Sequence, residues 1–333
     1  MHLAERRGIM KLKRFDGNPI LQPRGDDWES LAVSNCGVVH KDGKLHVLYR
    51  AIGEYTHYIS RVGYAIFDTN LNLVDRRNNP CFVPDLRFWE RSVEDVRLTE
   101  LEGKLYMSYV VTITPCPPAG VRRRLGLPKV EQAPTRIAVA ETNDFSKFTR
   151  LGFITPYGTN QRDTVIFPEK INDNIAVLHR PSNWIGSSYG TNIPGIWFAY
   201  LDRWEGGMFG HKLVMKSEYD WESYKIGAGP PPIKTDEGWL LIFHGVDNNR
   251  TYRAGAALLD LEKPWEVIAR TSAPILEPEQ EYECVGDMPN VVFPEGAVIL
   301  GDELLIFYGG ADKVCCVART NIEKFITKLL EEI

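Results

Sequence analysis

The sequence predicts an all-β protein, a single five-bladed β-propeller closed by an N-terminal strand and followed by a short C-terminal helix. Three observations support this fold class: a five-fold internal repeat, period-two alternation of apolar residues within each repeat, and an N-terminal segment that resembles the end of two repeats. Short antiparallel strands that recur at a fixed spacing are typical of a propeller. The repeats therefore predict one domain, residues 1–333.

Each repeat contains a polar turn followed by an apolar strand that ends near an aromatic or histidine residue, and the copies recur every 60 to 70 residues or so. The five copies are 43–51, 103–111, 173–181, 237–246 and 302–311. A strand is predicted before each copy, at 35–42, 95–102, 163–171, 230–237 and 290–300, and another after it, at 61–68, 135–143, 195–202, 252–260 and 314–321. β-branched and aromatic residues with period-two alternation favour strands, so each unit is an antiparallel meander.

Fourth strands are more variable, as the outer edges of blades can be. Candidates are 73–84, 148–155, 211–217 and 266–278. The fifth unit has none after it, because 321–333 has helical spacing, but residues 12–23 resemble 78–84 and 271–278. We expect 12–23 to supply the missing strand and remove an open edge. The predicted blades are 24–84, 85–155, 156–217, 218–278 and 279–320 plus 12–23, with helix 321–333.

Composition excludes several classes of function. The chain of 333 residues has 39 Lys and Arg against 44 Asp and Glu, a net charge of −5, which argues against nucleic acid as a partner. Six cysteines fall at no zinc spacing, and there is no glycine-rich nucleotide loop, so no metal or organic cofactor is predicted. No stretch of 18 apolar residues occurs and the first residues lack an apolar leader, so we expect a cytoplasmic protein without a membrane partner.

Polar residues begin the innermost strands, which line the axis of a propeller. These starts are Ser34-Asn35, Glu94-Asp95, Arg162-Asp163, Gly227–Gly229 and Asp287–Asn290. A single Asp or Asn at such a place equally well caps a turn. Four polar starts of five favour a shared site for a ligand the size of a carbohydrate.

The motifs at these places resemble those of glycoside hydrolase family 130. They are S-V-E-D-V-R (92–97), R-D-T-V-I-F-P-E-K-I (162–171), L-H-R-P (178–181), K-I-G-A-G-P-P-P-I (225–233), H-G-V (244–246), V-G-D-M-P-N-V-V-F-P (285–294) and Y-G-G-A-D (308–312). The resemblance implies a five-bladed propeller that acts as an inverting β-mannoside phosphorylase, or as one of the family's hydrolases. E-D-V-R departs from the family's usual E-D-P-R, which leaves the backbone of that turn open.

The resemblance makes Asp95 the single catalytic carboxylate, donating its proton to the departing oxygen through the 3-hydroxyl of the mannosyl unit. An ordinary inverting glycosidase needs a second carboxylate to activate water, whereas phosphate is already a nucleophile. The alternative for Asp95 is a structural salt bridge to Arg97, and Glu94 is expected to orient the turn.

The resemblance also implies an anion site, because arginine forks suit phosphate oxygens. Its predicted members are Arg136, Arg162, His179 and Arg180, with inorganic phosphate as co-substrate. Substrate-binding residues carried over are Asn35, Arg50, Asp163, His244, Asp287, Tyr308 and Asp312. Carboxylates and amides suit sugar hydroxyls. The aromatic residues Tyr308, Trp184 and Tyr189, together with His244, are candidates either for stacking on a sugar or for packing between blades.

A Pro- and Gly-rich insertion, residues 114–134, interrupts the second unit and contains three consecutive arginines. It either walls the acceptor side, contacts a second subunit, or binds nothing. The leading hypothesis is a phosphorylase that converts a β-mannoside and phosphate into α-mannose 1-phosphate and a shortened saccharide. The alternatives are a β-mannoside hydrolase, with Asp163 or Glu283 activating water, and a non-catalytic propeller that binds a glycan or a protein. Linkage, acceptor sugar and homo-oligomerisation are left open.

Overall fold

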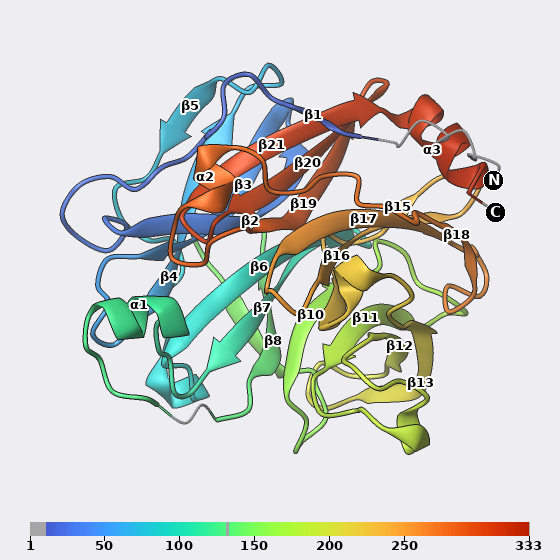
Figure 1. Cartoon of the computed structure of the whole chain (residues 1–333), viewed down its shortest axis with the longest axis horizontal. Helices are drawn as coiled ribbons and strands as arrows, with labels where there is room; N and C mark the ends of the chain where they lie inside the picture. Colours follow the sequence, from blue (N-terminus) through green and yellow to red (C-terminus); the bar gives the residue numbers. More distant parts are fainter. Residues whose placement is uncertain (1–10, 131–132, 333) are drawn as a thin grey trace, which may run out of the picture.

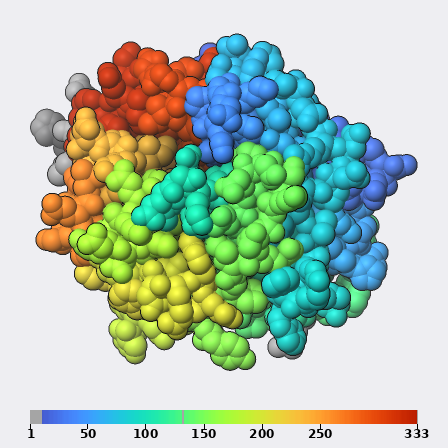
Figure 2. Space-filling model, turned by 180° about the vertical axis from the view of Figure 1, so that it is seen from behind, coloured from blue at the N-terminus to red at the C-terminus, as the bar shows by residue number. Residues whose placement is uncertain are grey.

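The computed structural model describes residues 11–130 and 133–332, and its strands form five antiparallel sheets arranged in a ring (Figure 1). Each sheet is a blade whose strands follow one another from the axis outwards. Seen from behind, the colours run around the molecule in chain order, and the red of the last blade meets the blue of the first (Figure 2). The predicted five-bladed β-propeller is confirmed.

The first three blades are each built from four consecutive strands. Blade 1 contains β2 (Ala32–Lys41), β3 (Lys44–Ile52), β4 (Ser60–Phe67) and β5 (Leu73–Arg76). Blade 2 contains β6 (Ser92–Leu101), β7 (Lys104–Thr112), β8 (Arg136–Thr142) and β9 (Thr149–Phe153). Blade 3 contains β10 (Gln161–Ile166), β11 (Ile175–Pro181), β12 (Ile196–Leu201) and β13 (Met208–Met215).

The last two blades depart from this plan. Blade 4 contains β14 (Lys225–Ala228), β15 (Ile233–Lys234), β16 (Trp239–Val246), β17 (Tyr252–Leu259) and β18 (Val267–Arg270). Blade 5 contains β19 (Val292–Leu300), β20 (Glu303–Gly310), β21 (Val314–Asn321) and β1 (Lys13–Arg14). The helices are α1 (Ala119–Arg124), α2 (Glu281–Cys284) and α3 (Ile322–Leu330), with single turns η1 (Leu86–Phe88), η2 (Ser187–Tyr189) and η3 (Asp220–Glu222).

The innermost strand of blade 4 is split, and it begins earlier than the predicted 230–237. Both β14 and β15 pair with β16, and the segment between them contains Pro230, Pro231 and Pro232. Proline has no backbone N–H to donate, so three in succession interrupt the ladder. The correction matters because it adds Lys225 to the start of this strand.

Five apolar clusters lie between neighbouring blades and hold the ring together. In the cluster between blades 1 and 2, for example, Leu48 and Tyr64 pack with Met107. The cluster between blades 5 and 1 joins Phe307 to Val47 in the same way. Since each sheet buries both faces against its neighbours, the core is a set of radial layers around the axis.

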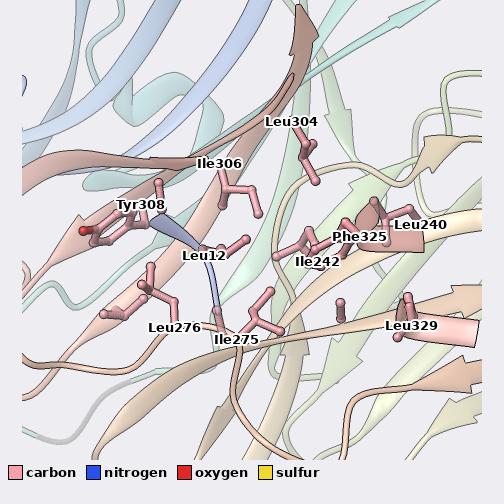
Figure 3. Packing of buried hydrophobic residues seen from close by; sticks show 14 of the residues in the cluster. Leu12, Leu240, Ile242, Ile275, Leu276, Leu304, Ile306, Tyr308, Phe325 and Leu329 are labelled. Carbon is pink, nitrogen blue, oxygen red and sulfur yellow. The ribbon is translucent and has the colours of Figure 1, made fainter. Parts of the chain in front are cut away.

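The N-terminal strand closes the last blade, as predicted. Strand β1 pairs with β21 at Lys13↔Arg319 and Arg14↔Ala318, and Leu21 bridges to Cys315 further along. Leu12 is buried in the cluster between blades 4 and 5 (Figure 3). The close-up shows Leu12 beside Ile306, Leu276 and Ile275, which come from both blades. The two ends of the described chain therefore complete one sheet.

The short C-terminal helix is also confirmed. Asn321 caps α3 by accepting a hydrogen bond from the backbone N–H of Lys324 (3.0 Å). Phe325, Ile326 and Leu329 are buried in the same cluster as Leu12. Within the described part of the chain, none of the helices has the length and apolar character required to cross a membrane.

A buried ion pair recurs in four blades, and we call it the Glu–Arg clamp. A glutamate that precedes the innermost strand pairs with an arginine of the outermost strand, and the second strand supplies an aromatic ring at the same place. The members are Glu29, Tyr49 and Arg76 in blade 1, Glu90, Tyr109 and Arg150 in blade 2, Glu222, Phe243 and Arg270 in blade 4, and Glu283, Tyr308 and Arg14 in blade 5.

Blade 3 has uncharged residues at the corresponding place. His179 of β11 lies 3.1 Å from His211 of β13 through Nε2, and 3.1 Å from Gln161 through Nδ1. Burial lowers the pKa of His179 well below its ordinary value, so the ring is neutral. In blades 1, 2, 4 and 5 this residue of the second strand packs in the apolar cluster shared with the preceding blade.

We expect Leu12→Ala to destabilise the closed ring. Loss of the buried side chain leaves a cavity between blades 4 and 5, which costs about 2–5 kcal/mol. The matched control is Lys13→Ala, because Lys13 is exposed on the same strand. Thermal unfolding followed by circular dichroism should show a melting temperature several degrees lower for Leu12→Ala alone. Equal melting temperatures for the two variants would contradict the closure by this segment.

Candidate active site

Bulges in the innermost strands direct polar side chains toward the axis. Register shifts occur around Asn35 in blade 1, Asp95 in blade 2 and Asp163 in blade 3, and each of these residues has a φ of 54°. Asn and Asp tolerate this left-handed conformation better than most residues, and a bulge re-aims its side chain. Three consecutive blades therefore present an amide or a carboxylate at an equivalent place.

Blades 4 and 5 have different residues at the place that corresponds to Asn35, Asp95 and Asp163. In blade 4, Gly227 stands against the side chains of Asp163 and His244, which leave no room for a Cβ atom. In blade 5 the register shift lies between Pro294 and Gly296, so Glu295 is the bulged residue. Glu295 is completely buried, and burial raises its pKa well above the ordinary value although Arg97 opposes this. The sequence reasoning did not identify Glu295.

Asp95 lies among donors from blades 1 and 3. Its Oδ1 accepts a hydrogen bond from Asn35 Nδ2 (2.8 Å) and lies 3.4 Å from Arg50 Nη1. Its Oδ2 lies 3.6 Å from Arg162 Nη1. Glu94 bridges the same two arginines, at 3.2 Å from Arg50 and 3.1 Å from Arg162. Glu94 therefore positions both cations beside the Asp95 carboxylate.

The structure does not form the alternative salt bridge between the side chains of Asp95 and Arg97. Arg97 Nη1 instead donates to the main-chain oxygen of Asp95 (2.9 Å), and Nε donates to that of Gly229 (2.9 Å). Arg97 Nη2 pairs with Asp163 (3.3 Å) and Glu295 (3.0 Å). Arg97 thus holds the backbone of the turn and leaves the Asp95 carboxylate to other partners.

Four basic residues of blades 3 and 4 gather around Asp163; we call them the basic cluster. Arg180 Nε donates to Asp163 Oδ2 (2.7 Å), and His244 Nε2 lies 3.6 Å from the same oxygen. Arg162 and Lys225 complete the group, because each lies within electrostatic reach of the other members. Burial opposes ionisation of Asp163, but Arg180, His244 and Arg97 outweigh it and hold its pKa far below the ordinary value.

The basic cluster carries more positive charge than Asp163 neutralises. Burial, with repulsion from Arg180 and Arg162, lowers the pKa of Lys225 to about 7. Burial likewise lowers the pKa of His244 to about 3, although Asp163 opposes this. Both ring nitrogens of His244 are buried without a hydrogen-bond partner among the described residues. A site with spare donors and excess cations fits an oxyanion such as phosphate.

Two further carboxylates lie toward blades 5 and 1. Asp287 accepts hydrogen bonds from the hydroxyls of Tyr55 (2.6 Å) and Tyr58 (3.4 Å). Arg50 lies over the ring of Tyr58, 5.6 Å from its centroid. Desolvation, together with the charges of Asp95 and Asp287, raises the pKa of Asp312 to about 7 although Arg50 opposes it. These groups can donate to and accept from sugar hydroxyls.

Three residues from the predicted site are not brought to this cluster by any contact between described residues. His179 and Tyr308 occupy the clamp position of their blades, where Tyr308 donates to Glu283 (2.8 Å). Arg136 of β8 lies over the ring of Phe153, 4.1 Å from its centroid, and donates to the main-chain oxygen of Thr155 (3.3 Å). Alternation along the second strand explains the two clamp residues, because their side chains face the preceding blade, whereas the next residue, such as Arg180, points to the opposite face of the sheet and reaches Asp163.

Two of the aromatic residues predicted to stack on a sugar, Trp184 and Tyr189, lie in the connection between β11 and β12. Trp184 stacks on Tyr189 with centroids 5.7 Å apart, and its edge meets Trp197 and His211. Tyr189 is exposed, while Trp184 is half-buried. Packing within blade 3 therefore accounts for Trp184, and Tyr189 presents its ring to solvent.

The sequence reasoning also missed Lys225, Tyr55 and Tyr58. Lys225 stands two residues before Gly227, the glycine that takes the place of Asn35, Asp95 and Asp163. If the innermost strand of blade 4 had been predicted to begin at K-I-G-A-G (225–229), Lys225 would have been a candidate site residue. Tyr55 and Tyr58 lie in the β3–β4 connection, where no repeat pattern marks them.

The fold is a five-bladed propeller with carboxylates and basic side chains gathered at its axis, and the comparisons with known proteins assign it to a class. A family model described as β-1,4-mannooligosaccharide phosphorylase matches residues 11–332. The chain belongs to glycoside hydrolase family 130.

Two curated relatives align with more than nine-tenths of the chain. It is 37% identical to a 1,2-β-oligomannan phosphorylase of Thermoanaerobacter sp. (strain X514), covering 93% of this chain and 97% of the relative. It is 35% identical to a β-1,2-mannobiose phosphorylase of the same organism, covering 95% and 99%. The solved β-1,2-mannobiose phosphorylase of Listeria innocua superposes with a TM-score of 0.79 at 25% identity, covering 97% of this chain and all of that one.

Asp312 should make stability depend on pH. The unfolded chain releases this proton near pH 4, whereas the folded protein retains it up to about pH 7. The stabilisation is therefore fully present below about pH 4 and is lost as pH rises to about 7. Asp312→Asn mimics the protonated group, so the melting temperature of the wild type should fall relative to that of this variant as the pH rises from about 4 to about 7. A constant difference across that range would contradict the raised pKa.

Proposed function

We propose that the protein is an inverting phosphorylase that cleaves a β-mannosidic linkage with inorganic phosphate. The products are α-D-mannose 1-phosphate and a shortened saccharide. The observation that carries this proposal is the basic cluster, which lies next to the Asp95 carboxylate and is joined to it through Arg162. The reaction uses phosphate as co-substrate and needs no metal or organic cofactor. A cytoplasmic location and assembly into a homo-oligomer stay predictions.

In this proposal Asp95 is the proton donor and the mannosyl unit lies between it and the basic cluster. Asn35, Arg50, Asp287 and Asp312 hold the hydroxyls of that unit. Arg162, Arg180, Lys225 and His244 hold phosphate next to the anomeric carbon. Arg162 contacts both Glu94 and Asp95, so it links the anion site to the acid. Fixing both reactants in one geometry removes much of the entropic barrier to their reaction.

The contacts of the two nominated bases speak against the hydrolase alternative. Asp163 is buried and paired with Arg180 and Arg97, which leaves it a weak base. Glu283 is completely buried and paired with Arg14 and Tyr308 in the clamp of blade 5. A water-activating carboxylate must reach the reacting centre with a free lone pair. Neither residue meets this requirement.

The names of the relatives guide the choice of substrate. Those with 37% and 35% identity are named for β-1,2-linked mannosides, so β-1,2-mannobiose is the first compound to test. Incubation of a panel of β-mannosides with and without phosphate, with an assay for mannose 1-phosphate, tests the function. Equal cleavage in phosphate-free buffer, with release of free mannose, would make hydrolysis the better conclusion.

Lys225→Ala should weaken phosphate binding. Loss of one charge-assisted hydrogen bond costs about 1.5–3 kcal/mol, which corresponds to a roughly 10- to 100-fold higher KM for phosphate. The KM for the saccharide should change much less. Lys234, an exposed lysine of the same blade, gives the matched control Lys234→Ala.

Arg136→Ala tests whether Arg136, which the sequence places in the anion site, binds phosphate. Arg136 lies outside the basic cluster of Arg162, Arg180, Lys225 and His244, so we expect an unchanged KM for phosphate in this variant. A larger increase for Arg136→Ala than for Lys225→Ala would overturn the assignment of the basic cluster.

Asp95→Asn should abolish most turnover while the fold persists. The substitution removes a proton donor without changing the shape of the side chain, and general acid catalysis contributes about 10²–10⁴-fold. Initial rates of mannose 1-phosphate formation measure the loss, and the melting temperature reports on the fold. If the variant kept more than half of the wild-type rate, Asp95 would not be the acid.

A further inference from the structure

Blade 4 carries a pocket that the proposed reaction does not use. Its volume is about 550 Å³, within the range of roughly 300–1,000 Å³ that is typical of small-molecule sites. Its lining comes from the connection that contains η3, from the connection between β16 and β17 with the start of β17, and from the segment between β18 and α2. Asp95, Asp312 and the basic cluster are not among its lining residues, so this pocket is separate from the axial site.

The indole ring of Trp221 forms one side of the pocket and is held in a fixed position. It stacks on Phe243, with centroids 5.7 Å apart, and its N–H donates to the main-chain oxygen of Ser272 (3.2 Å). The ring also lies against Gly245 and Gly255, where a Cβ atom on either residue would collide with it. A fixed aromatic ring at the side of a pocket is a surface on which a sugar can stack.

The internal repeat explains why a tryptophan stands here but does not explain the pocket. Blade 1 has the same four residues, D-W-E-S, at 27–30 that blade 4 has at 220–223, and Trp28 likewise donates to a main-chain oxygen, that of Asn78 (2.9 Å). Trp28 is only 6% exposed, whereas Trp221 is half-buried. The pocket beside Trp28 measures about 220 Å³, which is below the usual range for a ligand. The larger pocket and the more exposed ring belong to blade 4.

A pair of charged residues forms the polar side of the same pocket. Arg253 is the partner of Gly245 in the β16–β17 ladder, so its side chain lies on the face of the sheet that Trp221 covers. Its Nη1 donates to Asp247 Oδ2 (2.9 Å), and its Nε lies 3.5 Å from Glu277 Oε2. The Arg253 and Asp247 side chains are 20% and 15% exposed. The remaining polar residues of the lining are Asp220, Ser223, Asn248 and Asn249.

The charge of the lining favours a neutral ligand. Asp220, Asp247 and Glu277 stand against Arg253, and Lys11 pairs with Glu277 from outside the lining (2.6 Å), so negative charge is in excess. Phosphate and sugar phosphates are therefore repelled. Among the described residues, no group of three metal-binding side chains is placed to hold a cation. A fixed aromatic ring beside a guanidinium, carboxylates and amides matches the apolar face and the hydroxyls of a saccharide.

We propose that this pocket is a second saccharide-binding site, in which a neutral sugar stacks on Trp221 while Arg253 and Asp247 bind its hydroxyls. The choice of a mannoside as the occupant rests on the proposed function, since that reaction supplies the saccharide. The pocket takes no part in the chemistry at the axis. Binding there keeps a saccharide on the surface of the protein while the axial site is occupied by another sugar unit.

Fluorine NMR of protein labelled with fluorotryptophan tests the pocket in the Asp95→Asn background, without phosphate. The chain has eight tryptophans, and Trp221→Phe identifies the resonance of Trp221. We expect β-1,2-mannobiose to shift this resonance with saturation, and inorganic phosphate to leave it in place. Arg253→Met should weaken this binding roughly 10- to 100-fold, as expected for the loss of a charge-assisted hydrogen bond. The matched control is Arg319→Met, because Arg319 is an ion-paired arginine of blade 5 outside the pocket.

Three results would each overturn the proposal. They are a Trp221 resonance that stays in place at every saccharide concentration, a shift that Arg253→Met does not weaken, and a shift that is lost when Asp287→Asn is added to weaken the axial site. If Arg253→Met lowers the melting temperature, Asn249→Ala, which removes an exposed side chain of the lining, takes its place. Because the titrations contain no phosphate, a wild type that hydrolyses its substrate would refute phosphorolysis, while the titrations would still decide the pocket.

Discussion

The guanidinium of Arg97 is the interaction on which the centre of the ring depends. It starts from blade 2 and binds Asp163 of blade 3, the main chain of Gly229 in blade 4 and Glu295 of blade 5. Without it, two buried carboxylates would lose a partner, and breaking a buried ion pair in this way costs about 3–5 kcal/mol. The same side chain fixes the main chain at Asp95. One residue thus sets the spacing of four blades and the orientation of the proposed acid.

The second strand of each blade serves stability and the site through adjacent residues. Tyr49 belongs to the clamp of blade 1 and Arg50 reaches Asp95, while in blade 3 His179 takes the clamp position and Arg180 binds Asp163. Neighbours along a strand point to opposite faces, so the two roles do not compete for space. The clamp stabilises the face of the sheet that packs on the preceding blade. The same strand therefore holds a charged side chain in a fixed position on its opposite face.

The sequence sufficed for the fold because each blade repeats one pattern of turn and alternating strand. For the site, the sequence predicted Asp95, Arg162 and Arg180 from motifs near the polar starts of strands, and in the structure these side chains lie in one connected group of charges, while their roles stay predictions. The sequence could not separate His179 from its neighbour Arg180, and only the contacts in the structure show that Arg180 binds Asp163 while His179 lies against Gln161 and His211. Lys225 was not predicted as a site residue, because the three prolines 230–232 made the start of its strand hard to recognise in the sequence. Tyr55 acts through contacts with distant segments, which no local pattern reveals.

The shared last blade also bears on how the chain folds during its synthesis. Strand β1 emerges from the ribosome first, but its partner β21 is among the last segments made, since Lys13 pairs with Arg319. Blades 1 to 4 have all their strands earlier and can assemble in order, as N-terminal units generally do. Until β21 arrives, the nascent protein is an open arc with apolar faces exposed at both ends. This intermediate is the species that would aggregate or recruit a chaperone, and the final blade decides when it disappears.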